Sequence, residues 1–361
     1  MKSDTNRNLN RECSKGMDDL ADDGSGTSAC LAKVWKLKGG FALSKVMTLK
    51  DAIAKYVHSG DHLALGGFTT DRKPYAAVYE ILRQGITDLT GLSGAAGGDW
   101  DMLIGCGRVK AYINCYTANS GVTNVSRRFR KWFEAGKLTM EDYSQDVIYM
   151  MWHAAALGLP FLPVSLMQGS SLETEWGISK EVRKTLDKVP DDKFVEIKNP
   201  FNDKQRVLAI PVPQIDVAII HAQQASPDGT VRIWGGKFQD VDIAMAAKHT
   251  IVTCEEIISN EEIRRDPTQN DIPCMCVDAV VLAPYGAHPS QCFGLYDYDN
   301  PFLKVYDVVS KTQEDFDAFC KEWVFDLKDH DEYLNKLGAT RLINLKVVPG
   351  LGYHVDMTKE G

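Results

Sequence analysis

The stretch HLALGGFTTDRKPYAAVYEILRQG, residues 62–85, joins two kinds of hydrophobic pattern. Its first residues, HLALGG, form a continuous apolar run ending in two glycines, which is typical of a buried strand that enters a tight turn. Pro74 stands near the start of a helical pattern that stops at Gly85. A strand, a glycine turn and a helix in this order predict one unit of an α/β protein, where such turns bring backbone N–H groups close to a ligand.

The glycine turn matches neither of the common phosphate-binding motifs. No third glycine follows at dinucleotide-binding spacing, and no Lys-Ser or Lys-Thr pair follows as in a P-loop. The segment GCGRVK at Gly105 also lacks the third glycine, and the chain contains no G-x-S-x-G or H-E-x-x-H. Nucleotide-dependent, serine-hydrolase and zinc-protease classes are therefore disfavoured.

Strand-like and helix-like segments alternate along the rest of the chain. Thr48 is a predicted N-cap, with Asp51 as its acidic partner three residues on. The pattern predicts an α/β fold with an open, mainly parallel sheet covered by helices on both faces. We expect strands at 62–67, 89–95, 109–117, 215–222, 230–236, 250–256 and 276–284, and helices at 48–60, 73–85, 124–136, 144–158, 240–249, 312–327 and 330–338.

Two segments lack this alternation of strand-like and helix-like patterns. Residues 1–42 mix charges, Ser, Gly and Asn without a strand or helix period, so we expect a poorly ordered N-terminal extension. Residues 43–361 are expected to form the main domain. Within it, about 169–206 is polar and less regular, as in an insertion or a link between halves.

Composition narrows the class of partner and the compartment. The formal net charge of −8 argues against general nucleic-acid binding, and 44% hydrophobic residues allow a substantial core. No segment has the length of a membrane span or the apolar core of a secretory signal. Nine cysteines, an odd number in mostly apolar surroundings, are typical of reduced structural thiols. We therefore expect a cytoplasmic protein that binds neither nucleic acid nor membrane.

Four glycine-containing or polar turns follow predicted strands, at residues 66–69, 93–98, 117–121 and 234–236. In an open α/β sheet such turns meet at the carboxyl ends of the strands, where ligands bind. Their N–H groups can stabilise a carboxylate or an oxyanion. For any single turn, the more ordinary explanation is that glycine permits a tight bend. Four together favour a ligand cleft.

Other polar residues carry weaker signals. His153, His221 and His288 have no partners at metal-ligand or triad spacing, so we interpret them as structural and expect no metal. The basic residues of SRRFRKWF could bind a phosphate. A solvated helix face, with Phe129 and Trp132 turned inward, is the more ordinary interpretation of Arg127, Arg128, Arg130 and Lys131.

Long stretches of the sequence resemble the alpha-type (A) subunits of family I CoA-transferases. The resemblance runs from Leu43 to the end and is carried by GGFTTDRKPYAA, INCYTANSGVTNVSRRFRKWF, VAIIHAQQASPDGTVRIWGGKFQDVDIA and VVLAPYGAHPSQC, among others. It implies the open α/β fold that these enzymes share with sugar-phosphate isomerases. It also implies an active site at the contact with a B subunit, in an alternating A/B hetero-oligomer.

The resemblance further implies a reaction. CoA would move from acetyl-CoA, or a similar donor, to glutaconate or a related dicarboxylate such as 2-hydroxyglutarate, in glutamate fermentation by the hydroxyglutarate route. A glutamate of the B subunit would be the nucleophile, and this chain contains no Ser-Glu-Asn-Gly. No cofactor is implied, because the CoA thioester is a substrate.

This chain would supply part of the acyl pocket. The family loop G-G-F-x-x-x-G-x-P has Arg72 at its last glycine position here. This arginine could meet the distal carboxylate of the substrate, pair with Asp71 or project into solvent. The resemblance assigns the pocket to Gly66, Gly67, Phe68, Thr69, Asn119 and Ser120.

Two alternatives and one hypothesis stay open at this level. The chain could belong to an acyl-CoA hydrolase or ring-opening enzyme of the same superfamily, or act as a non-catalytic scaffold for its partner. Because the family pattern starts near Leu43, we hypothesise that this codon is a UUG or CUG start and that residues 1–42 are not translated.

Overall fold

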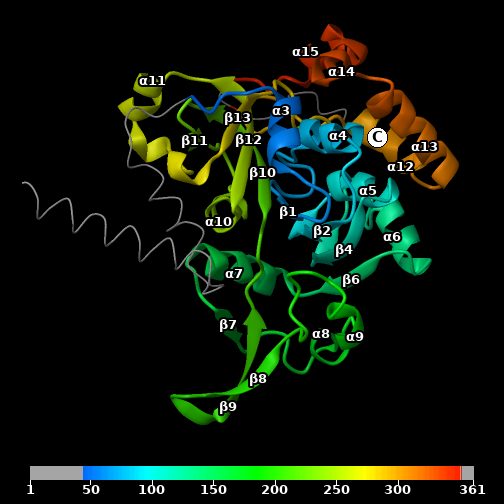
Figure 1. Cartoon of the computed structure of the whole chain (residues 1–361). Coiled ribbons are helices and arrows are strands. Elements are labelled where there is room, and N and C mark those ends of the chain that lie inside the picture. Colours follow the sequence, from blue (N-terminus) through cyan, green and yellow to red (C-terminus); the bar gives the residue numbers. More distant parts are fainter. Residues whose placement is uncertain (1–43, 350, 352–361) are drawn as a thin grey trace, which may run out of the picture.

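An open, mainly parallel sheet lies at the centre of the molecule (Figure 1). The computed structural model describes residues 44–349 and 351, so the expected extension 1–42 lies outside the described residues. Every neighbouring pair on the main path of the sheet is parallel. The strands, in the order in which they lie side by side, are β13 (Ala279–Leu282), β12 (His249–Ile257), β10 (Val217–Ala225), β1 (His62–Leu65), β2 (Leu89–Leu92), β4 (Val109–Asn114) and β6 (Thr139–Asp142).

The strand order reverses at β1. From β1 the chain builds outward through β2, β4 and β6, and it later returns to β10 on the other side of β1 before adding β12 and β13. Such a switch point leaves a crevice beyond the carboxyl ends of the two central strands, which is where open α/β sheets bind ligands. The glycine turn that follows β1 therefore lies at the switch point.

Helices cover both faces of the sheet, as predicted. Along β1, Leu63 and Leu65 belong to one hydrophobic core, whereas Ala64 belongs to the other. The first core packs beneath α3 (Leu49–Tyr56), α4 (Tyr75–Arg83), α5 (Gly98–Gly105), α6 (Arg127–Glu134), α12 (Asn300–Val309), α13 (Gln313–Cys320), a π-helical turn (Lys321–Phe325), α14 (His330–Leu337) and α15 (Ala339–Leu345). The second includes residues of α7 (Gln145–Ala156) and α10 (Asp240–Ala246).

A smaller antiparallel sheet lies beyond α7, at the lower end of the view in Figure 1. Its order is β7–β9–β8, and most of the expected insertion, about 169–206, belongs to this region. The side chains of its inner face join the second core. Its elements are β7 (Phe161–Val164), α8 (Ser171–Thr174), α9 (Lys180–Arg183), β8 (Val195–Asn199) and β9 (Asn202–Pro211).

The remaining elements are short. Strands β3 (Ala95–Ala96) and β5 (Tyr116–Thr117) form a separate parallel ladder, and β11 (Val231–Arg232) pairs antiparallel with β10. Helix α11 (Asn260–Arg265) is followed by 3-10 turns at Pro267–Gln269 and Cys274–Cys276. In the part of the chain that the structure describes, no helix combines the length and apolarity needed to cross a membrane.

The sequence pattern predicted most of these elements correctly. Thr48 caps α3 as expected, since its side chain accepts a hydrogen bond from the Asp51 N–H. The elements that the pattern does not predict are helices α5, α8, α9, α11, α12 and α15 and strands β6, β7, β8 and β9. In α5 the signal was missed because all eight residues are buried and no polar face marks a helical period.

Candidate functional site

Three of the four predicted turns are joined by hydrogen bonds beyond the carboxyl ends of β1, β2 and β4. The Thr69 N–H of the first turn donates to the Ala95 carbonyl of the second over 3.0 Å. The Gly98 N–H donates to Asn119 Oδ1 of the third over 2.8 Å. The structure therefore brings these turns into one cluster at the switch point of the sheet.

The backbone donors of the first turn already have acceptors within the chain. A Cβ at Gly67 would lie 2.3 Å from the Asp71 carbonyl oxygen, and its φ of +73° favours glycine. The glycines thus serve close packing of the chain on itself, and their N–H groups are not available to a ligand in this conformation. The acceptors are the Ile219 carbonyl for Gly66, Asp240 Oδ1 for Gly67, the Asp71 carbonyl for Phe68 and the Ala95 carbonyl for Thr69.

The side chains of this turn offer an aromatic surface. Phe68 is half-buried and stacks on Phe238, with ring centroids 4.9 Å apart, and the Phe238 ring is partly exposed. Thr69 is buried and has a φ of +45°, a conformation that β-branched residues rarely adopt. The turn therefore presents aromatic rings toward solvent while its threonine is held inside.

Arg72 neither projects into solvent nor pairs with Asp71. It is fully buried, and its Nη1 lies 2.5 Å from Asp240 Oδ2, a carboxylate that is also fully buried. The same guanidinium donates to the carbonyls of His221 and Gly236, which ties the fourth turn, 234–236, to the other three. In this structure the carboxylate that Arg72 meets is the protein's own.

Several residues that hold the cluster were not predicted. Lys73 and Asp99 form a second fully buried ion pair, with Nζ and Oδ2 2.9 Å apart. Gln239 donates to the Gly67 carbonyl beside the Asp240 contact. Sequence spacing gives no signal for these pairs, since Arg72 and Asp240 are 168 residues apart. Burial raises the pKa of the neighbouring Asp71 carboxyl to about 6.

The third turn carries donors without partners. Asn119 is buried and its Oδ1 is used by Gly98, but its amide NH₂ donates to no atom of residues 44–349 and 351. The backbone N–H groups of Ser120 and Gly121 likewise find no acceptor among those residues. Ser120 itself is exposed. Among the predicted site residues, this turn is therefore the one equipped to bind a carbonyl or carboxylate oxygen.

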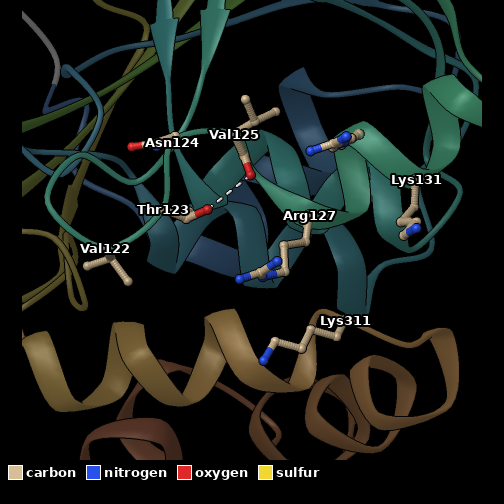
Figure 2. A pocket seen from close by; sticks show the side chains of 8 residues that line it. Val122, Thr123, Asn124, Val125, Arg127, Lys131 and Lys311 are labelled. Carbon is tan, nitrogen blue, oxygen red and sulfur yellow. Dashed lines mark hydrogen bonds between the residues drawn. The ribbon is translucent and has the colours of Figure 1, made fainter.

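A basic pocket adjoins the third turn (Figure 2). It has a volume of about 480 Å³ and lies between the loop 122–125, the first turns of α6 and the end of α12. The prediction that all four basic residues of SRRFRKWF face solvent is wrong for Arg128. That side chain is buried, and it donates to the carbonyls of Ser310 and Lys311, which anchors α6 on the α12–α13 corner.

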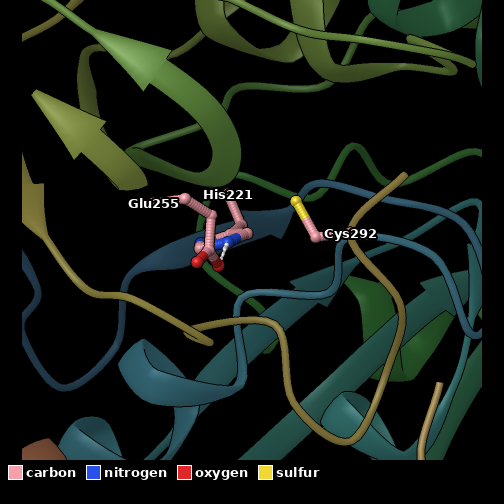
Figure 3. Close-up of side chains that lie close together, drawn as sticks. All are labelled: His221, Glu255 and Cys292. Atoms are coloured by element: carbon pink, nitrogen blue, oxygen red, sulfur yellow. Dashed lines mark hydrogen bonds and ion pairs between the residues drawn. The ribbon is translucent and has the colours of Figure 1, made fainter. Parts of the chain in front are cut away.

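A buried polar network lies behind the first turn (Figure 3). Ligand atoms of His221, Glu255 and Cys292 lie within 4.8 Å of one another, a set of atoms that could hold a metal ion. Hydrogen bonds already engage the Glu255 carboxylate, which accepts from Tyr296 OH and the Tyr285 N–H and lies 2.7 Å from His221 Nε2.

The remaining atoms of the network connect it to the candidate site. His221 Nδ1 lies 2.9 Å from Thr253 Oγ1, and the His221 carbonyl accepts from Arg72. Burial raises the pKa of the Cys292 thiol well above its ordinary value, so a neutral thiol is favoured there. We interpret the cluster as a support for the Arg72–Asp240 pair.

The open, mainly parallel sheet of this chain is the fold of a solved CoA-transferase. The family model for Coenzyme A transferase matches residues 46–283, and the chain belongs to this family.

Relatives within the family lie at two levels of similarity. The chain is 91% identical over 318 residues to the A subunit of glutaconate CoA-transferase from Acidaminococcus fermentans, covering 88% of this chain and 99% of that protein. The crystal structure of that organism's glutaconate coenzyme A-transferase superposes with a TM-score of 0.86, over 88% of this chain and 100% of the matched chain. The A subunit of 3-oxoadipate CoA-transferase from Pseudomonas knackmussii is 32% identical, over 82% of this chain and 99% of that protein.

Proposed function

We propose that this chain is the A subunit of a heteromeric CoA-transferase that moves CoA from acetyl-CoA, or a similar donor, to glutaconate or a related dicarboxylate such as 2-hydroxyglutarate. The observation that carries the proposal is the 91% identity to a glutaconate CoA-transferase subunit over nearly its full length. Glutamate fermentation by the hydroxyglutarate route is the process in which we place this activity.

The chemistry would proceed through a glutamate of the partner B subunit. Its carboxylate attacks the thioester carbon, and CoA thiolate leaves as an acyl-glutamyl anhydride forms. The thiolate then attacks the glutamyl carbonyl of the anhydride, which gives a glutamyl-CoA thioester and the free donor acid. The acceptor carboxylate takes CoA by the same two steps in reverse, so the glutamate is regenerated.

Two buried carboxylates near the turns of this chain, those of Asp99 and Asp240, are poorly suited to that nucleophilic role. Asp99 is paired with Lys73, and Asp240 is paired with Arg72. A carboxylate held in a buried ion pair is stabilised in place and is a weak nucleophile. This arrangement supports a division of labour in which the partner carries the nucleophile.

We assign this chain the task of shaping the acyl pocket. The Asn119 amide and the backbone N–H groups of Ser120 and Gly121 would donate to the acyl or carboxylate oxygen, because they have no acceptors among the described residues. Residues 66–69 would form a wall of the pocket, with Phe68 facing the substrate chain. Arg72 would hold this wall in position through Asp240.

The decisive experiment is an exchange assay on the co-purified A and B subunits with acetyl-CoA and glutaconate. We expect glutaconyl-CoA and acetate to form in equal amounts, and neither of the two subunits to be active by itself. Release of free CoA without acyl transfer would instead identify a hydrolase.

A substitution then tests whether this chain contributes to the site. Asn119→Ala should lower kcat/KM by about 10²-fold, the size of effect seen when an oxyanion donor is removed. Ser120→Ala tests the neighbouring exposed side chain. Lys321→Ala, on the exposed π-helical turn, is the control and should leave kcat/KM unchanged. Unchanged turnover in Asn119→Ala, Ser120→Ala and Thr69→Ala would reduce this chain to a scaffold.

Two further parts of the proposal concern the whole protein. We place it in the cytoplasm, supported by the free thiols of all seven cysteines in the described residues. We also propose that the subunit consists of residues 43–361, without residues 1–42. The intact mass of the protein from its native host tests this, and a peptide from residues 1–42 would contradict it.

A further inference from the structure

The basic pocket beside the third turn carries more positive charge than its neighbours neutralise. Four cationic side chains line it, and no acidic residue does. The Arg127 guanidinium is held by Asp307 over 2.7 and 2.8 Å. The cationic residues are Arg127, Arg130, Lys131 and Lys311.

The other cations have fewer partners. Arg130 and Lys131 share a single carboxylate, that of Glu134, at 2.7 and 3.8 Å. Lys311 has no carboxylate within 4.0 Å among residues 44–349 and 351. Two carboxylates therefore face four cations, so the pocket is a favourable place for an anion with several negative charges.

The pocket is also shaped to hold a group larger than a single ion. Its volume of about 480 Å³ falls in the range of small-molecule sites. Asn124, which lines the pocket on the side of the loop 122–125, has a side chain without a hydrogen-bond partner in the described part of the chain. A polyphosphate would find both charge and hydrogen-bond donors there.

Its position relates it to the proposed acyl site. The Asn119 carbonyl accepts from the N–H groups of Val122 and Thr123, so the wall of the pocket continues directly from the turn that holds the unpartnered donors. CoA is an extended molecule with its reacting sulfur at one end and its pyrophosphate and 3′-phosphate at the other. A thioester held at Ser120 would leave that anionic end free to reach a neighbouring basic site.

We propose that this pocket binds the phosphate groups of the CoA substrate, so that this chain recognises the nucleotide end of CoA while the partner supplies the nucleophile. The inference rests on the proposed function for its choice of ligand. Free phosphate and an acidic surface of the B subunit share the chemistry of this ligand, and the experiment separates them.

The test compares acetyl-CoA with acetyl-pantetheine, which has the same thioester and no phosphates, in the A/B complex with glutaconate as acceptor. Lys311→Ala and Arg130→Ala should each raise KM for acetyl-CoA by about two- to fivefold, the size expected for a solvent-accessible ion pair, with kcat unchanged. KM for acetyl-pantetheine should not change. Lys321→Ala removes an equal charge outside the pocket and should alter neither substrate's KM.

Three results would overturn the proposal. An equal rise in KM for acetyl-CoA and acetyl-pantetheine would mean that the pocket does not bind the phosphates. Loss of the A/B complex on a sizing column in the variants would assign the pocket to the partner's surface. Inhibition by inorganic phosphate that is equal in wild type and variants would place phosphate binding elsewhere.

A binding measurement keeps this inference separate from the proposed function. Calorimetric titration of CoA into the complex needs no acceptor acid, and the variants should weaken CoA binding while leaving pantetheine binding unchanged. If the wild-type complex transfers no CoA to glutaconate but the variants still weaken CoA binding, the proposed acid fails and the pocket assignment stands.

Discussion

Arg72 is buried with its carboxylate partner at the switch point of the sheet, which makes it the most consequential single side chain of the candidate site. Both members of the Arg72–Asp240 pair are 0% exposed, and the pair also holds the Gly67 N–H and the Gly236 carbonyl. A buried ion pair adds little net stability, but removing one partner leaves a buried charge without compensation. The residue thus acts on the turn through Asp240.

We predict that Arg72→Ala lowers the free energy of unfolding by about 3–5 kcal/mol, because Asp240 is left buried and unpaired. Urea unfolding of the wild type and the variant measures this. Lys328→Ala is the control, since that lysine is 85% exposed and its removal should leave the unfolding midpoint unchanged. A shift in Arg72→Ala no larger than in the control would contradict the buried pair.

Asp71 gives the turn a pH dependence whose sign can be worked out. Burial raises its folded-state pKa from 3.8 to about 6. Between about pH 3.8 and pH 6 the Asp71 carboxyl is protonated in the folded chain and ionised in the unfolded chain. The free energy of unfolding therefore decreases as pH rises through this range. Asp71→Asn abolishes that loss because the amide stays neutral.

The expected difference is about 3 kcal/mol in favour of Asp71→Asn at about pH 7, falling toward zero at about pH 4. Unfolding curves of both proteins across this range measure it. Asp101, whose pKa burial also raises to about 6, is present in both proteins and cancels in the comparison. A constant difference between the two proteins at every pH would show that Asp71 does not titrate as described.

At the scale of elements, the turns beyond β1, β2 and β4 depend on one another because their backbones touch. Gly97, just before α5, is the point of closest approach: a Cβ there would lie 2.3 Å from the Thr69 carbonyl oxygen and 2.9 Å from Asn119 Oδ1. Backbone atoms cannot turn aside as a flexible side chain can. The three turns can therefore meet only if this residue lacks a side chain.

Gly97→Ala should destabilise the chain by about 2–3 kcal/mol and lower the transfer activity of the A/B complex, because the turns must separate. Gly60→Ala is the matched control. Nothing lies within 4 Å of a Cβ at that position, so only its φ of +89° disfavours alanine, which costs about 1 kcal/mol. Similar losses in the two variants would mean that conformation, rather than contact between turns, decides the effect.

At the scale of the whole molecule, a buried ionic cluster links the main sheet to the smaller one. Glu141, on β6, is fully buried and lies 2.5 Å from Arg183 Nη2 and 2.8 Å from Lys193 Nζ. Both cations belong to the polar segment 169–206. This segment is therefore fixed to the main sheet by charge as well as by the second hydrophobic core.

Glu141→Gln keeps the shape of the side chain but leaves two buried cations without a counter-charge. We predict a loss of about 3–5 kcal/mol and faster tryptic cleavage at Arg183 and Lys193. Glu196→Gln removes an exposed carboxylate of the same segment and should change neither quantity. Unchanged protease resistance in Glu141→Gln would mean that the apolar core alone holds the segment.

Much of the fold could be predicted because its signals are local. The cap at Thr48, the apolar run before Gly66 and the proline-led helix each depend on residues within one turn or strand of one another. Helix α5 is an exception because it is buried on all sides and so shows no helical period. The sequence could predict which turns form the candidate site, but it could not predict the hydrogen bonds and ion pairs that join them.

The α/β class, the order of many elements and the family can be predicted from the amino-acid sequence, because periodicity, capping and extended similarity depend on residues that are neighbours along the chain. The folded arrangement is needed to see that Arg72 meets Asp240, that the N–H groups of residues 66–69 are already used, and that Lys311 joins the basic residues of α6 around one pocket. These contacts form because the chain returns to β10 beside β1, which places residues far apart in sequence against the first turn. Which donors remain for a substrate depends on those distant contacts.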